Sequence, residues 1–341
     1  MIKILLPALL FVSLQAYAEV VNDMYAEREL VHAQARYERR IDELFSQRLW
    51  GLMKEEERRA LPDVRILLPL KGNSPLDAFS GRIDGIPTVV LPVLTLKFIE
   101  DLSMAYAWRH VYQYSLEPID EYLAMLKYRR PGDFPGSRVL NPLTALGVPA
   151  RIWEKDKRVD DLSLRFRNTA WAFILAHELE HLRRRHPGNG SVPAEDSQRQ
   201  EQEADAFAVE LFRRSDEIPM GMILWFQASV GYFPNRTDFH SEAEYRDWLR
   251  GKLNHPRWGS ATHPMNPGRL MNLAAAINQS ADESLSRSHS AILRFIAGKV
   301  VAIGDILAEP DMQRLIARCA ILGNPDDLKR LEHRPCDQRL N

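Results

Sequence analysis

The segment His177-Glu178-Leu179-Glu180-His181 constrains the fold of this chain more than any other feature. It lies in a stretch with helical periodicity that begins at Val159, and the Pro187-Gly188-Asn189-Gly190 sequence beyond it predicts the end of the helix. On a helix, His177 and His181 are about one turn apart and project from the same face. We therefore expect a fold organised around a helix that presents two imidazoles and a carboxylate together.

Two imidazoles at this spacing are typical of zinc sites, in which a tetrahedral ion keeps one position open for water when the site is catalytic. Glu178 follows the first histidine and is suited to act as a general base toward that water. The apolar run Trp171–Ala176 before the motif predicts a dry setting, in which electrostatic effects are stronger. The sequence therefore predicts one Zn²⁺ per chain, with His177 and His181 as ligands and Glu178 as the base.

A third ligand is expected on the next predicted helix, which starts near residue 196. Glu201 and Asp205 are four residues apart and share a face of that helix. Glu201 can therefore bind zinc while Asp205 accepts a hydrogen bond from the free N–H of a ligand histidine. Glu203 points to another face and is the alternative ligand. These acidic residues can instead form surface ion pairs with Arg183–Arg185, which contribute little to stability.

His186 is the nearest additional histidine, five residues after His181. A third ligand so close would need the chain to turn back, and Arg184 stands where a glycine would allow that turn. We expect His186 at the helix end or behind a ligand rather than on the metal.

The sequence Ser260–Leu270 (SATHPMNPGRL) holds two further candidates. His263, held by Pro264, is suited to stabilise the negative oxygen of a tetrahedral intermediate. Arg269 is expected to support this oxyanion or to bind substrate. A His-Pro pair alone is commonplace, as His255-Pro256 nearby shows.

The N-terminus predicts export. Lys3 precedes a short apolar run, and Ala16-Tyr17-Ala18 is an A-x-A cleavage site, so residues 1–18 are expected to be a signal peptide. The run is too short to span a bilayer comfortably, although an uncleaved anchor is the alternative. We expect a periplasmic or secreted protein without a stable membrane span. Cys319 and Cys336 can then form a disulfide or stay as two structural thiols.

The net charge of −1 indicates neither a nucleic-acid binder nor a binder of anionic membranes. Helical patterns dominate the chain, beginning with an amphipathic segment around Tyr37–Leu52 that we expect to pack on the domain. Residues 64–72 and 86–94 read as short strands, and the proline in each predicts sheet edges. The predicted class is α+β, mainly α-helical, with a small edge-exposed sheet. Residues 19–275 form the expected main domain with a loop or lid at 131–150, and 276–341 form a C-terminal helical region.

The combination resembles the CAAX-prenyl-protease-type zinc metallopeptidases (gluzincins), which include periplasmic proteases of outer-membrane-protein quality control. The likeness rests on HELEH with His186 beyond it, on EQEADAFAVEL (201–211) and on Thr-His-Pro followed by Arg269-Leu270. Leu76–Gly81 (LDAFSG) is similar to a family stretch that leads into an edge strand. The resemblance implies a zincin-like domain, His177, His181 and Glu201 as zinc ligands, Glu178 as the base and His263 as the oxyanion donor.

This chain departs from the family pattern in three places. Only residues 182–200 separate the second histidine from Glu201, Asp77 replaces the usual asparagine, and residues 107–165 look like an insertion. The departures concern subfamily and substrate more than zinc binding.

The predicted function is therefore zinc-dependent hydrolysis of internal peptide bonds in extended or misfolded polypeptides, outer-membrane proteins among them. The first alternative is a zinc-containing, chaperone-like protein that binds clients without cleaving them, against which the presence of Glu178 argues. The second is a helical interaction protein that carries the motif by accident and binds no metal.

Overall fold

The computed structural model describes residues 24–128, 139–187, 192–250, 252–253, 263 and 265–308. Its described part is mainly helical with one small sheet, which confirms the predicted α+β, mainly α-helical class. The predicted signal peptide, Cys319 and Cys336 lie outside the described residues.

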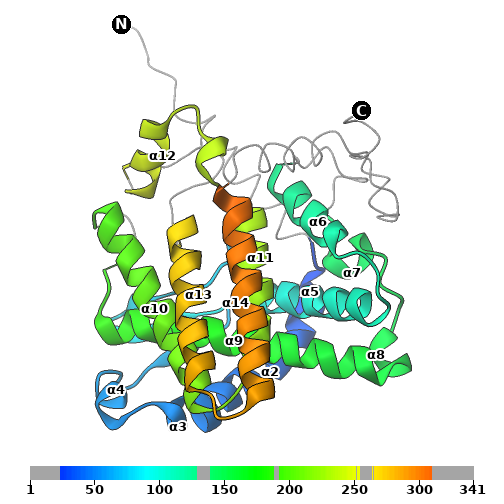
Figure 1. Cartoon of the computed structure of the whole chain (residues 1–341), viewed down its shortest axis with the longest axis horizontal. Helices are drawn as coiled ribbons and strands as arrows, with labels where there is room; N and C mark the ends of the chain where they lie inside the picture. The colour runs from blue at the N-terminus through cyan, green and yellow to red at the C-terminus, as the bar shows by residue number, and fades with distance from the viewer. Residues whose placement is uncertain are drawn as a thin grey trace, which may run out of the picture.

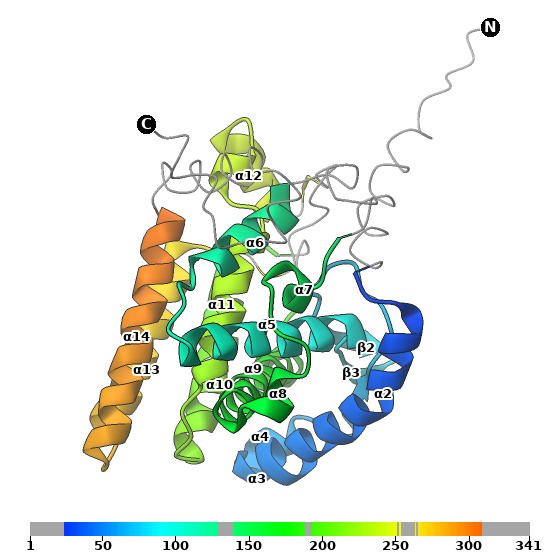
Figure 2. The ribbon, with the colours of Figure 1, turned by 90° about the vertical axis from the view of Figure 1, so that its right-hand side faces the viewer.

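Helix α9 (Lys157–Arg184) is the central element of the helical layer (Figures 1 and 2). Asp156 caps its start, where its carboxylate accepts a hydrogen bond of 3.0 Å from the Arg158 amide. The helix packs against α5 (Val93–Val111), α10 (Ala194–Arg214) and α11 (Met220–Tyr232). Because α9 is covered by other helices, its second half is buried almost all round, from Thr169 to Glu180.

Helix α11 approaches α9 at Gly221, where only a glycine fits. A Cβ atom placed on Gly221 would overlap the Phe166 carbonyl and the Ala170 amide of α9. The Gly221 amide instead donates a hydrogen bond of 2.8 Å to Thr169 Oγ1. This close approach fixes α11 against the middle of α9, ahead of the turns that carry the histidines.

The sheet consists of β1 (Arg65–Leu67), β2 (Phe79–Ile83) and β3 (Ile86–Val90) in the order β1-β3-β2. Strand β1 is parallel to β3, and β2 is antiparallel to it. A two-residue turn with positive φ at Asp84 and Gly85 joins β2 to β3, as expected for a tight hairpin. Figure 2 shows β2 and β3 beside α5 and the N-terminal helix α2 (Glu27–Asp42).

The prediction that both proline-containing strands are edges is right for β1 and wrong for β3, which is central. Pro87 pairs with Arg82, next to the Ile83–Ile86 pair that closes the turn. A pair in that place is not hydrogen-bonded in a two-residue hairpin, so Pro87 removes no bond to β2. The second edge of the sheet is β2, in the stretch that the family resemblance predicts to lead into an edge strand.

The N-terminal amphipathic segment packs on the domain, as predicted. Helix α2 buries Leu30, Ala33, Tyr37 and Ile41, and it is followed by a π-helix η1 (Glu43–Leu49) and the short helices α3 (Trp50–Leu52) and α4 (Glu55–Arg59). Tyr37 contacts Trp171 of α9 edge to face, with ring centroids 5.0 Å apart.

The stretch that looked like an insertion forms helices packed on the same core: α6 (Glu117–Tyr128), α7 (Pro142–Ala145) and α8 (Ile152–Lys155). They contact α11, α5 and α9 respectively. The expected loop at 131–150 therefore contains α7, whose start is capped by Asn141, and its first part lies outside the described residues.

Beyond α11 follow a 3₁₀ turn η4 (Arg236–Asp238) and the helices α12 (Glu242–Leu249), α13 (Pro267–Glu283) and α14 (Arg287–Ala308). Helices α13 and α14 lie side by side as an antiparallel pair (Figure 1), and α13 also packs on α10. Within the described residues, no helix has the length and apolarity needed to cross a membrane.

Candidate metal centre

His177 and Glu178 lie on the continuously buried part of α9, and the half-buried His181 follows directly after it. The Glu178 side chain is only 1% exposed, and His177 is 5% exposed as a residue. The imidazole rings of His177 and His181 are 4.8 Å apart, and their Nε2 atoms are separated by 3.1 Å. The i, i+4 spacing thus brings the same nitrogen of both rings to one point, as the sequence predicts.

Glu201 and Asp205 face these histidines from α10. Glu201 places its two carboxylate oxygens 3.5 Å from His177 Nε2 and 3.5 Å from His181 Nε2. Asp205 lies behind His177, where its Oδ1 is 2.9 Å from Nδ1. Asp205 therefore holds a proton on Nδ1 and leaves Nε2, on the side of Glu201, as the nitrogen that can bind a metal.

Four side chains converge here: the ligand atoms of His177, His181, Glu201 and His263 all lie within 4.8 Å of one another. Imidazole nitrogens and a carboxylate are a donor set that suits Zn²⁺. His177 and Glu201 of this set are buried, and His181 and His263 are half-buried. Asp205, behind His177, has the position that the carboxylate partner of a metal-bound histidine usually takes. The residues present fit a zinc ion by this test.

Arg269 of α13 joins the two carboxylates of α10. Its Nη1 is 2.7 Å from Glu201 Oε2, and its Nε and Nη2 lie 2.7 and 2.9 Å from the two oxygens of Asp205. All three side chains are at most 2% exposed. The guanidinium neutralises and orients these carboxylates. The oxyanion or substrate role expected for Arg269 stays a prediction.

His263 lies between Glu201, Glu178 and the start of β2. Its Nδ1 is 3.2 Å from Glu201 Oε2, and its Nε2 is 2.9 Å from the Ala78 carbonyl oxygen and 3.4 Å from Glu178 Oε1. The contact with Ala78 could not be predicted from the sequence, because every residue has a backbone carbonyl. It connects the metal centre to the exposed edge of the sheet.

The Glu178 carboxylate has a free oxygen. Oε1 is buried and accepts no hydrogen bond from the residues that the structure describes. A buried carboxylate oxygen without a donor is costly, and a catalytic role or a bound ion is one explanation for such an atom. Glu178 is thus available to take a proton.

The charges of the cluster shift its pKa values strongly. Burial opposes protonation of His177, yet Asp205 and Glu201 raise its pKa to about 10. Burial lowers the pKa of His181 well below the usual range. Burial would raise the pKa of Glu201, but Arg269 and His263 hold it well below the ordinary value. A metal ion at the cluster would replace the proton of His177, since ligation requires a neutral imidazole.

The remaining acidic and histidine candidates contact other groups. Glu180 is buried and its oxygens bind Arg183 and Arg184. Glu203, the alternative ligand of the sequence analysis, has its Oε2 3.3 Å from His186 Nε2. His186 in turn contacts His181, from the side opposite to the convergence point.

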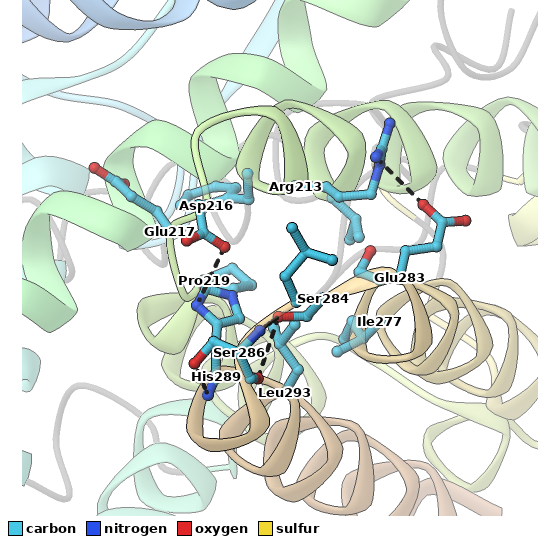
Figure 3. A pocket seen from close by; sticks show the side chains of 14 residues that line it. Arg213, Asp216, Glu217, Pro219, Ile277, Glu283, Ser284, Ser286, His289 and Leu293 are labelled. Carbon is cyan, nitrogen blue, oxygen red and sulfur yellow. Dashed lines mark hydrogen bonds and ion pairs between the residues drawn. The ribbon is translucent and has the colours of Figure 1, made fainter.

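A separate cavity of about 230 Å³ lies between the α10–α11 turn and the α13–α14 turn (Figure 3). Arg213 bonds Glu283 across it, and His289 faces Asp216 at 3.5 Å. The cavity shares no residue with the His/Glu cluster, and the remaining charged side chain of its lining, Glu217, pairs with Arg48. We assign it no catalytic role.

Comparison with known proteins supports a peptidase. Residues 154–219 match the model of the family described as Peptidase U49. This short segment comprises α9 and α10 with His177, Glu178, His181, Glu201 and Asp205, so the similarity covers the candidate metal cluster except His263. No curated protein and no solved structure matches the chain significantly. The resemblance to the CAAX-prenyl-protease type stays a prediction.

Proposed function

We propose that this chain is an exported, zinc-dependent endopeptidase that cleaves extended or misfolded polypeptides. The observation that carries the proposal is the buried Glu178 Oε1, which accepts no hydrogen bond from the described residues and lies 3.4 Å from His263 Nε2, beside a cluster of side chains that suit zinc. A purely structural metal site has no need for such a base. The match of this segment to a peptidase family supports the same reaction class.

In this proposal His177 Nε2, His181 Nε2 and Glu201 hold the ion. Zinc bound there would polarise the scissile carbonyl and lower the pKa of a water molecule. Glu178 takes the proton of the attacking water and gives it to the leaving amine, which a buried carboxylate without a hydrogen bond can do in both directions. Asp205 and Arg269 keep the ligands oriented throughout the cycle.

His263 is the proposed oxyanion donor, through its Nε2–H. That group lies at the Ala78 carbonyl in the structure, 2.9 Å away. Its use as an oxyanion donor therefore requires an exchange of partner, from the carbonyl of Ala78 to the carbonyl of the substrate. Ala78 directly precedes β2, so a polypeptide that pairs with β2 arrives beside the group that must exchange.

The proposed substrates are recognised by their backbone. Strand β2 has β3 on one side only, and its Phe79 is 42% exposed. An extended polypeptide can add to such an edge by main-chain hydrogen bonds, which read sequence weakly. Unfolded outer-membrane proteins, rich in extended segments and expected in the compartment to which residues 1–18 would direct the chain, are our proposed clients.

One observation favours the alternative of a zinc-containing binding protein. His263 is close enough to act as a fourth ligand, and a site with four protein ligands is closed to water. A chain with such a site would hold clients at β2 without cleaving them.

The test is cleavage of β-casein, an unfolded protein, by purified residues 19–341 with equimolar zinc. Glu178→Gln is the matched variant, because it keeps the size of the side chain and removes the base. Cleavage by the native chain alone, with equal zinc content in both proteins, is the expected result. Zinc binding without cleavage in either protein would favour the binding protein, and equal cleavage by both would refute the role of Glu178.

A further inference from the structure

The two histidines on α9 are supported differently. Asp205 supports His177 directly, as described above. For His181, the nitrogen away from the convergence point is Nδ1, and it lies 3.0 Å from Nδ1 of His186. The other nitrogen of His186, Nε2, lies 3.3 Å from Glu203 Oε2. Glu203, His186 and His181 thus form a chain of hydrogen-bonding groups that ends at the metal centre.

The end of α9 creates this arrangement. Arg185 has a left-handed conformation with φ of 57°, and the His186 amide donates a hydrogen bond of 2.9 Å to the His181 carbonyl. This is the backbone pattern that closes a helix and turns the chain back over its last turn. The His186 ring therefore lies against the His181 ring, with centroids 5.0 Å apart, and its side chain is only 9% exposed.

The tautomers of His181 and His186 determine which group donates in each of these hydrogen bonds. A metal at His181 Nε2 needs the lone pair of that nitrogen, so the ring proton must be on Nδ1. The acceptor for this proton is Nδ1 of His186, whose own proton is then on Nε2 and is donated to the Glu203 carboxylate. Each ring carries one proton and every donor has an acceptor, so neutral imidazoles satisfy the whole chain.

On this basis we propose that His186 and Glu203 are positioning residues that hold His181 in the tautomer and orientation required for zinc. The inference rests on the proposed zinc site. It extends the role of α10, which then provides Glu201 to the cluster, Asp205 to one histidine and Glu203 to the other through His186. Alternate residues of the Glu201–Asp205 segment thereby serve the same centre.

The experiment measures zinc affinity of the purified chain by competition with a chromophoric chelator, and the Co²⁺ absorption spectrum as a second readout. His186→Leu removes the acceptor for His181 and should weaken zinc binding about 10- to 100-fold, the usual effect of losing such a partner. His186→Asn places a carbonyl oxygen near the position of Nδ1 and should restore most of the affinity. Glu203→Leu should cause a smaller loss than His186→Leu, because His186 can still accept.

His289→Leu is the matched control, since it removes a histidine that faces a carboxylate far from the centre. It should leave affinity and spectrum unchanged, and thermal melts of all variants show that they fold. Zinc binding by His186→Leu as tight as by the native chain would overturn the inference and leave the proposed function intact. Absence of stoichiometric zinc in the native chain would instead overturn the proposed function.

Discussion

Removal of the Arg269 guanidinium should destabilise this protein more than any loss of a surface charge. Arg269→Met keeps the length of the side chain but leaves Glu201 and Asp205, each at most 2% exposed, without their cation. Breaking a buried ion pair from one side costs about 3–5 kcal/mol, because a buried charge loses its partner. At about 2–4 °C per kcal/mol for a domain of this size, the melting temperature should fall by roughly 6–20 °C.

The assay is thermal unfolding followed by circular dichroism, with chelator and with saturating zinc. Zinc should recover part of the loss, because a divalent cation at Glu201 replaces some of the missing charge and ligand binding stabilises the folded state. Arg213→Met is the control: Arg213 pairs with Glu210 and Glu283 at the surface and should cost less than about 1 kcal/mol. A melting temperature for Arg269→Met within 2 °C of the control would refute the reasoning.

Three further predictions concern individual residues: Asp101, Gly221 and Asp205. Burial raises the pKa of Asp101 to about 6, so between about pH 4 and 6 the folded protein keeps a proton on this carboxyl that the unfolded chain has released. The free energy of unfolding of the native protein should therefore fall, relative to that of Asp101→Asn, as the pH rises from about 4 to 7. Urea unfolding at both pH values checks this. Gly221→Ala should lower the free energy of unfolding by about 1–3 kcal/mol or more in the same assay. Gly298 has open space around it, so Gly298→Ala should leave that free energy unchanged or raise it. Asp205→Asn should weaken zinc binding about 10- to 100-fold in chelator competition, because the support of His177 is altered.

The helical part of the fold could be predicted from sequence because periodicity and breakers specify it locally. The helix with His177 was expected from Val159 to Arg185 and runs over Lys157–Arg184, with its end at the predicted breakers. The sheet was harder, because strand order depends on pairing between segments. Pro87 indicates an edge, yet its register opposite Arg82 removes no hydrogen bond to β2, and Pro87 precedes the residues of β3 that pair with β1.

In the candidate site too, relations within one helix could be predicted from the sequence and contacts between helices could not. His177, His181 and Glu178 are related by positions on one helix, and Glu201 and Asp205 by positions on another, so their shared faces follow from helix geometry. The partners of Arg269 do not, because they depend on how α13 packs against α10. From sequence an arginine after a His-Pro turn suggested a group for substrate, whereas packing places it against Glu201 and Asp205.

Through Arg269, the C-terminal helices contribute a side chain that contacts the carboxylates of the His/Glu cluster. Two carboxylates that face the same point in a buried site repel each other and require a cation for a stable fold. That cation comes from the first turns of α13, which also carries Leu270 against Gly304 of α14. Helices α13 and α14 pack as a pair, so the position of Arg269 depends on the hairpin as a whole. Residue 275, the predicted end of the main domain, lies inside α13, which packs on α10 with its candidate ligand Glu201. The boundary between the main domain and the C-terminal helical region stays a prediction.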